Sequence, residues 1–197
     1  MKNPKVSSIT IVLLWGVLLF AGCTRRDAAV PRPEGYCRID RVDTIYTPRV
    51  VEGLSFDLPL SALVAVNDKP GWFNIEYPYY RATLWCSSVA LTKENRERQL
   101  ANSRELVYIH APKASAITAQ SYVDEEARKY ATLYRLEGDV ATPLQFEITD
   151  SVSYLFRGAL YFDTAVVADS VAPVVEYITD DVCRLVESLK PNSRGGI

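Results

Sequence analysis

The sequence is poor in the residues that enzyme sites most often use. It contains a single histidine, His110, and it lacks the Gly-x-Ser-x-Gly elbow, the His-Glu-x-x-His motif and a glycine-rich phosphate loop. A Ser-His-Asp arrangement would have to use His110. That residue is interpreted more simply as a polar side chain near the end of a helix. We therefore expect a protein that is not an enzyme and has no catalytic residues.

Cysteine is also scarce, with four residues and no Cys-x-x-Cys pair. Because zinc needs about four ligands at defined spacing, we expect no metal site, and nothing else in the sequence indicates a cofactor. If Cys23 is modified as argued below, Cys37, Cys86 and Cys183 remain. These three residues can form at most one disulfide, and the sequence does not identify the pair. Buried, unreactive thiols are the simplest interpretation.

Positive charge is not in excess, since 22 basic residues stand against 24 acidic ones. This balance argues against nucleic-acid binding and against a polybasic membrane-binding surface. Low-complexity sequence is absent apart from the termini, and 48% of the residues are hydrophobic. Most of the chain is therefore expected to fold.

The N-terminal apolar run is too short to cross a bilayer. It extends from Ile9 to Phe20, whereas a spanning helix needs ~20 apolar residues. It follows Lys2 and Lys5 and ends in the small residues Ala21 and Gly22. A charged start, a short hydrophobic middle and a small-residue end are typical of a secretory signal peptide. We predict that residues 1–22 are this peptide.

Cys23 is the predicted lipidation site, because the residues before it resemble the lipobox of bacterial lipoproteins. Phe20 stands where such boxes usually carry leucine. The alternative is an ordinary signal peptide beside a structural cysteine. Acyl chains contribute ~0.8 kcal/mol per buried methylene, so two or three chains hold a protein firmly. The membrane is thus an expected partner, contacted through acylated Cys23.

The rest of the chain divides into a tether, one domain and a tail. Residues 23–35 are predicted to be the lipidated cysteine and a flexible tether, in which Pro31 and Pro33 favour extended backbone. Residues 36–190 are predicted to form a single domain, and residues 191–197 a disordered tail.

Strand patterns dominate the predicted domain. The pattern over residues 154–162 is apolar on both faces, which is typical of a strand in the middle of a covered sheet. Further strands are predicted at residues 36–40, 72–77, 81–89, 130–137 and 144–149, with turns at 57–59 and 67–71. Residues 113–130 are ambiguous.

Two helices are expected. The first is polar, with Thr92 as N-cap and an end before Pro112. The second follows a cap at Asp169 or Ser170, and an apolar stripe extends to Leu189. Because the helices do not alternate strictly with the strands, we predict an α+β fold with an antiparallel sheet and helices packed on it.

Arg157 is the most unusual residue of the central strand. A charged side chain among apolar neighbours needs a partner, since an unpaired buried charge is costly. One interpretation is a structural ion pair beneath a covering helix, with Gly158 allowing close approach. The other is a recognition site for an acidic ligand or a partner protein.

Other candidate residues favour structural roles. The acidic runs 124–126 and 180–181 are interpreted as solvated faces, because adjacent helical residues do not face each other. Arg184 lies four residues after Asp180, at ion-pair spacing. The aromatic run 77–80 could stack on a ligand, although a place at the edge of the core is the preferred interpretation.

The chain resembles the GldD family of gliding-motility lipoproteins of Bacteroidetes-type bacteria. The resemblance rests on RPEGYCRID at residues 32–40, WFNIEYPYYRATL at 72–84, SRELVYIH at 103–110, LQFEITDS at 144–151, FRGALYF at 156–162 and DSVAPV at 169–174. These segments occur in the expected order over most of the chain after Cys23.

This resemblance implies a cell-envelope lipoprotein that is needed for gliding and is linked to the type IX secretion machinery, with protein partners there. It implies no enzyme activity. Surface-exposed lipoproteins of these bacteria usually carry acidic residues just after the cysteine, and residues 24–27 are not acidic. A periplasm-facing position is therefore expected, in the outer membrane rather than the inner one. The alternative function is a periplasmic lipoprotein that binds a small apolar or aromatic ligand.

Overall fold

The computed structural model describes residues 38–109, 111–165 and 167–191. They form a seven-stranded sheet whose neighbouring strands are all antiparallel. In spatial order its strands are β3 (Leu63–Val66), β4 (Trp72–Tyr77), β5 (Ala82–Ala90), β9 (Tyr154–Phe162), β8 (Leu144–Thr149), β7 (Lys129–Gly138) and β6 (Ala114–Asp124). As predicted, β9 is the central strand. Short 3-10 helices lie at Pro78–Tyr80 and Ala111–Lys113.

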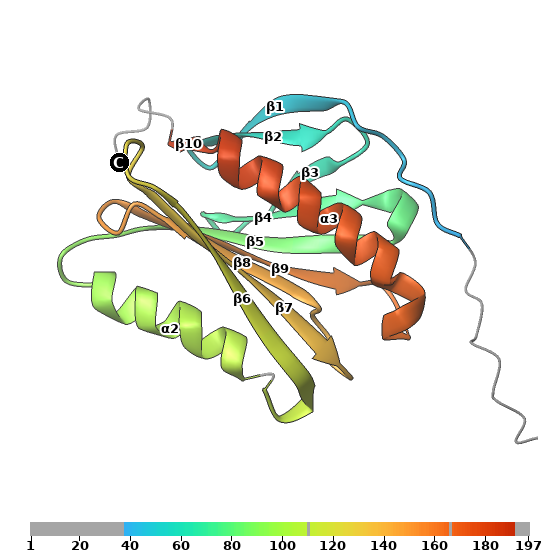
Figure 1. The fold of residues 1–197 in the computed structure, drawn as a ribbon. Helices are drawn as coiled ribbons and strands as arrows, with labels where there is room; N and C mark the ends of the chain where they lie inside the picture. Colours follow the sequence, from blue (N-terminus) through green and yellow to red (C-terminus); the bar gives the residue numbers. More distant parts are fainter. Residues whose placement is uncertain (1–37, 110, 166, 192–197) are drawn as a thin grey trace, which may run out of the picture. The chain divides into compact units, whose positions relative to one another are not determined.

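Within the described part of the chain, a smaller sheet and two α-helices accompany the large sheet (Figure 1). The small sheet has the order β1-β2-β10, with β1 at Tyr46–Val51, β2 at Leu54–Pro59 and β10 at Lys190–Pro191. The helices are α2 (Arg96–Tyr108) and α3 (Ala168–Ser188). The predicted α+β class and antiparallel sheet are confirmed.

One face of the large sheet is apolar and closed. Phe156 of β9 stacks against Phe56 of β2 and Phe73 of β4, with ring centroids 5.7 and 5.6 Å apart. Phe146 meets the same ring edge-on. A Cβ on Gly158 would lie only 2.5 Å from the Phe146 ring, so this glycine lets the ring pack against the central strand. A close backbone approach at Gly158 was predicted, but the nearest group is the side-chain ring of Phe146.

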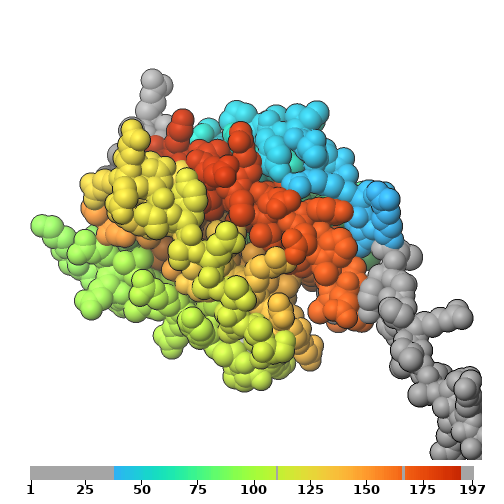
Figure 2. Space-filling view, viewed as in Figure 1, coloured from blue at the N-terminus to red at the C-terminus, as the bar shows by residue number. Residues whose placement is uncertain are grey.

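Helix α3 covers this apolar face together with the small sheet, and it lies between the N-terminal strands and the β6–β7 hairpin (Figures 1 and 2). Its predicted apolar stripe is buried, from Val174 to Val186. The predicted caps are wrong, because the helix begins at Ala168 and Val167 is its N-cap without a side-chain hydrogen bond. At the other end the Nζ of Lys129 donates to the carbonyl of Glu187, which satisfies a group that the helix leaves unpaired.

Among the described elements, α2 alone covers the opposite face (Figure 1). Ser103 and Val107 are the residues of α2 that the structure buries. Thr92 and Asn95 exchange hydrogen bonds just before the helix, so the helix begins at Arg96, slightly later than predicted. Val107 packs against Tyr134 and Leu136 of β7.

Four parts of the sequence were misread or left open. Residues 38–40 are not part of a strand, and 57–59 belong to β2 rather than to a turn. Strands β1 and β3 were missed, and the ambiguous segment 113–130 contains β6. The signal peptide, the tether and residues 192–197 lie outside the described residues. Within the described part of the chain, none of the helices has the length and apolar character needed to span a membrane.

Candidate functional site

A cavity of about 590 Å³ lies between α2 and the sheet face beneath it. Its floor comes from the centre of the large sheet and its roof from the second half of α2. Because β9 is central, the cavity has side chains from strands on both sides of it. This volume is within the usual range of small-molecule sites, about 300–1,000 Å³.

Strand register places the floor residues in two neighbouring rows. Ser87, Arg157 and Glu147 are direct cross-strand partners on β5, β9 and β8. In the next row Trp85 faces Ala159, which in turn faces Gln145. Since Ala159 is small, it leaves space between the Trp85 and Gln145 side chains. The floor is therefore polar at its centre and aromatic at one side.

Arg157 makes one hydrogen bond within this floor. Its Nε donates to the hydroxyl of Ser87 at 3.0 Å. Its direct neighbour Glu147 instead accepts a hydrogen bond from the hydroxyl of Tyr134 at 3.4 Å. The guanidinium and the carboxylate thus lean toward opposite sides, and among the described residues Arg157 has no ion pair.

Three polar atoms of the floor are buried without a hydrogen-bond partner among the described residues. They are the Nη1 of Arg157, the Oε2 of Glu147 and the Nε2 of Gln145. Glu147 is 8% exposed and Gln145 is 7% exposed. Buried polar groups are nearly always paired, so three of them on residues that line one cavity call for an explanation.

Burial also shifts the pKa values of two side chains in the cavity floor, Arg157 and Tyr134. It lowers the pKa of Arg157, and the nearby Glu147 opposes that change. Burial raises the pKa of Tyr134 to about 12, and the carboxylate of Glu147 adds to the increase. At neutral pH Tyr134 is therefore a neutral phenol that donates its hydrogen bond to Glu147.

Most side chains of the roof and the mouth of the cavity are apolar or aromatic, beside the polar Ser103 and Asp163. Leu106 and Ile109, at the end of α2, are 39% and 68% exposed. Trp85 and Tyr161 meet edge to face, with centroids 6.5 Å apart. Trp72 also lines the cavity. An occupant would meet hydrogen-bonding groups below and hydrocarbon above.

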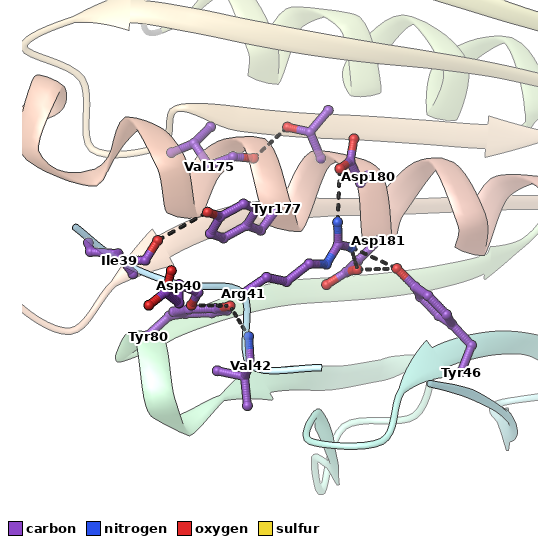
Figure 3. A network of polar contacts seen from close by, with 11 residues as sticks. Ile39, Asp40, Arg41, Val42, Tyr46, Tyr80, Val175, Tyr177, Asp180 and Asp181 are labelled. Carbon is purple, nitrogen blue, oxygen red and sulfur yellow. Dashed lines mark hydrogen bonds and ion pairs between the residues drawn. The ribbon is translucent and has the colours of Figure 1, made fainter. Parts of the chain in front are cut away.

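A second polar cluster lies on the other side of the sheet, where the described chain begins (Figure 3). Arg41 bonds to Asp180 at 3.0 Å and to Asp181 at 2.5 Å, both on α3. It also contacts the hydroxyl of Tyr46, which in turn donates to Asp181. We call Arg41, Tyr46, Asp180 and Asp181 the Arg41 network.

The Arg41 network corrects the interpretation of Asp181 as part of a solvated face, whereas Asp180 is exposed as predicted. Asp181 is 4% exposed, and burial raises its pKa, although Tyr46 and Arg41 both oppose that change. Arg184 does not pair with Asp180 as its spacing suggested, because its guanidinium bonds to Asp57 of β2. The network attaches the N-terminal segment of the domain to α3.

The other predicted residues are dispersed. Tyr77 is in the core and Tyr79 is 68% exposed, while Tyr80 bonds to Val42. Cys86 and Cys183 are free thiols, and burial raises the pKa of both. Of the acidic run 124–126, Asp124 ends β6, and Glu125 and Glu126 lie in the turn that follows. Cys23, Cys37 and His110 lie outside the described residues.

The chemistry of the cavity was only partly visible in the sequence. Arg157 was singled out, whereas Glu147, Gln145 and Ser87 were not, because their meeting depends on pairing between distant strands. Within the described ranges, no group of three or more His, Cys, Asp or Glu side chains could hold a metal ion.

Comparison with known proteins identifies the class. The structure described above is an α+β domain with a cavity that α2 partly covers. The family model for gliding motility lipoprotein GldD matches residues 26–190. The chain belongs to this family, as its sequence resemblance predicted, and it is a motility-related lipoprotein.

Two further comparisons add little. A search of curated proteins found no significant match. Among solved structures, cyanobacterial PsbP (CyanoP) from Synechocystis sp. PCC 6803 is similar at 13% identity and a TM-score of 0.42. That comparison covers 81% of this chain and 99% of the other, and it carries no argument about function.

Proposed function

We propose that this lipoprotein is a non-enzymatic component of the gliding apparatus that works together with the type IX secretion machinery. The observation that carries the proposal is the family match over residues 26–190. In this proposal acylated Cys23 anchors the chain in the outer membrane, facing the periplasm. The segment 24–27, in which two arginines outnumber one aspartate, supports the periplasmic side, and the lipobox-like sequence before Cys23 supports acylation.

The anchor is tested by complementing a deletion strain with the wild-type gene or with Cys23→Ser. We expect Cys23→Ser to lose palmitate labelling and to leave the membrane fraction, because a chain without acyl groups lacks its membrane contact. Cys37→Ser is the matched control and should stay in the membrane. Retention of Cys23→Ser after a carbonate wash would refute the anchor, and gradient separation of the two membranes tests the outer-membrane position.

The link to secretion is tested in the same strains. The deletion should abolish both colony spreading and the surface display of a type IX substrate, and the wild-type gene should restore both. Loss of spreading with normal secretion would refute the link to the secretion machinery.

The absence of catalysis is tested with the lone histidine. His110→Gln should support spreading at the wild-type level, since no proton transfer is assigned to this side chain. Loss of spreading with a stable, membrane-bound His110→Gln protein would argue for an enzyme.

A further inference from the structure

The floor of the α2 cavity has an unusual set of open hydrogen-bonding positions. Arg157 and Gln145 each keep a donor that has no partner among the described residues, and Glu147 keeps an acceptor. One charged donor and one charged acceptor stand on adjacent strands in direct register. An occupant that satisfies them needs a hydrogen-bond acceptor and a donor close together.

The net charge of the floor narrows the choice of occupant. Arg157 and Glu147 balance each other, so a lone anion would lie beside the Glu147 carboxylate and a lone cation beside the Arg157 guanidinium. Like charges in a buried site are costly. The floor therefore fits an uncharged group that both accepts and donates, and an amide C=O and N–H is such a group.

The side chains around the cavity restrict the choice of occupant further. Leu106, Val107 and Ile109 form the roof, and Trp85 and Tyr161 stand at the mouth. These surfaces favour a ligand with few polar groups and a substantial apolar or aromatic part. A saccharide would bring many hydroxyl groups against this hydrocarbon, where they would lose their hydrogen bonds to water.

The roof is also weakly attached. Ser103 and Val107 are the α2 residues that the structure buries, whereas α3 buries seven. Elements with little buried apolar surface open at low free-energy cost. Displacement of α2 would give a ligand access to the floor atoms that it now covers.

We propose that the cavity between α2 and the sheet binds an uncharged, amide-bearing ligand of about dipeptide size, with an apolar or aromatic side chain. The amide oxygen accepts from Arg157 and Gln145, and the amide N–H donates to Glu147. The side chain lies against Trp85 and Tyr161. This inference does not rest on the proposed role in gliding.

The test uses the full, processed lipoprotein in detergent micelles and N-acetyl-Leu-Phe-amide as the probe. Calorimetric titration should show saturable binding. Tryptophan fluorescence should change with the same saturation curve, because Trp72 and Trp85 follow the signal peptide in sequence and both line the cavity. Methyl cellobioside and octanoate should give no saturable signal.

Two variants and one control locate the binding. Arg157→Met should weaken binding by about tenfold or more, because it removes a charged hydrogen-bond donor. Leu106→Phe should also weaken it, since it fills the cavity from a partly exposed position and buries no charge. Arg135→Met is the matched control, because Arg135 lies off the cavity in an exposed pair with Glu176. It should bind like the wild type.

Each contrary result is decisive. No saturable binding of the capped dipeptide, stronger binding of the saccharide or the fatty acid, or equal weakening by Arg157→Met and Arg135→Met would overturn the proposal. If Arg157→Met fails to fold, binding of the capped dipeptide by Leu106→Phe at the wild-type level would overturn the proposal.

Discussion

The two faces of the seven-stranded sheet are built differently, although the same strands supply both. On the α3 face the alternate side chains of β9 are Phe156 and Leu160, and both are fully buried. On the α2 face they are Arg157, Ala159 and Tyr161, which line a cavity. The first face holds the fold together. On the second face, buried positions hold groups that contribute little to stability. Such departures from regular apolar packing are usual at binding sites.

The largest expected effect tests the closed face. Phe156→Ala should lower the free energy of unfolding by about 3–5 kcal/mol, because it leaves a hole among three phenylalanine rings. Leu106→Ala on the α2 roof should cost less than about 1 kcal/mol. Chemical denaturation measures both changes, and similar losses would show that the faces do not differ in packing.

The next effect tests the attachment of the N-terminal segment to α3. Arg41→Met should lower the free energy of unfolding by about 2–3 kcal/mol, because it leaves the buried carboxylate of Asp181 without its cationic partner. This loss is somewhat less than that expected for a fully buried pair. Burial already raises the pKa of Asp181, and loss of Arg41 should raise it further.

The direction in which stability changes with pH follows from the raised pKa of Asp181. A raised carboxyl pKa gives stability that is fully present below the unfolded value, about 3.9, and is lost as the pH rises through the folded value. The deficit of Arg41→Met should therefore grow from acidic to neutral pH. Arg38→Met is the control, because its pair with Asp40 is exposed. A deficit of Arg41→Met that did not change with pH would contradict this account.

A smaller effect is expected on the open face. Tyr134→Phe should cost about 1 kcal/mol at neutral pH, because Glu147 loses its only side-chain donor among the described residues. Burial raises the pKa of Tyr134 to about 12, so its contribution is present below pH 10.0 and disappears as the pH rises toward 12. Ultraviolet titration of tyrosinate should show one late-titrating group fewer in the variant. An unchanged titration would contradict the burial of Tyr134.

The smallest expected effect on stability is at Arg157, and it distinguishes a residue that binds a ligand from one that holds the fold. Arg157→Met should change the stability by less than about 1 kcal/mol, because among the described residues the guanidinium makes one hydrogen bond, to Ser87, and no ion pair. Thermal melts of this variant and of Arg135→Met provide the comparison. A loss above about 3 kcal/mol would mean that Arg157 holds the fold rather than a ligand.

Sequence patterns predicted the closed face better than the open one. Buried strands such as β4, β8 and β9 carry strong local signals, because each places apolar residues at regular intervals. Strand β6 was left ambiguous because it is an edge strand whose residues are mostly exposed. Strand β2 was read in part as a turn because Pro59 ends it.

The sites depend on residues that are far apart in the chain, and no local pattern reports such meetings. Asp181 was expected in water because its partner Arg41 is 140 residues away. Glu147 and Gln145 look like the solvent side of an alternating strand, and only the β8–β9 register and the covering helix bury them. Arg157 alone stood out, because a charge in a two-sided apolar strand violates a local rule.

The Arg41 network also determines how the domain carries mechanical load. Arg41 lies three residues after Arg38, where the described chain begins, and the β1–β2 ladder starts at Tyr46, whose hydroxyl is itself bonded to Asp181. Traction on the chain from the N-terminal side therefore reaches the aspartates of α3 before it reaches any β-ladder hydrogen bond. Such a pull meets the hydrogen bond from Tyr177 to the carbonyl of Ile39 and then these ion pairs before it reaches β1.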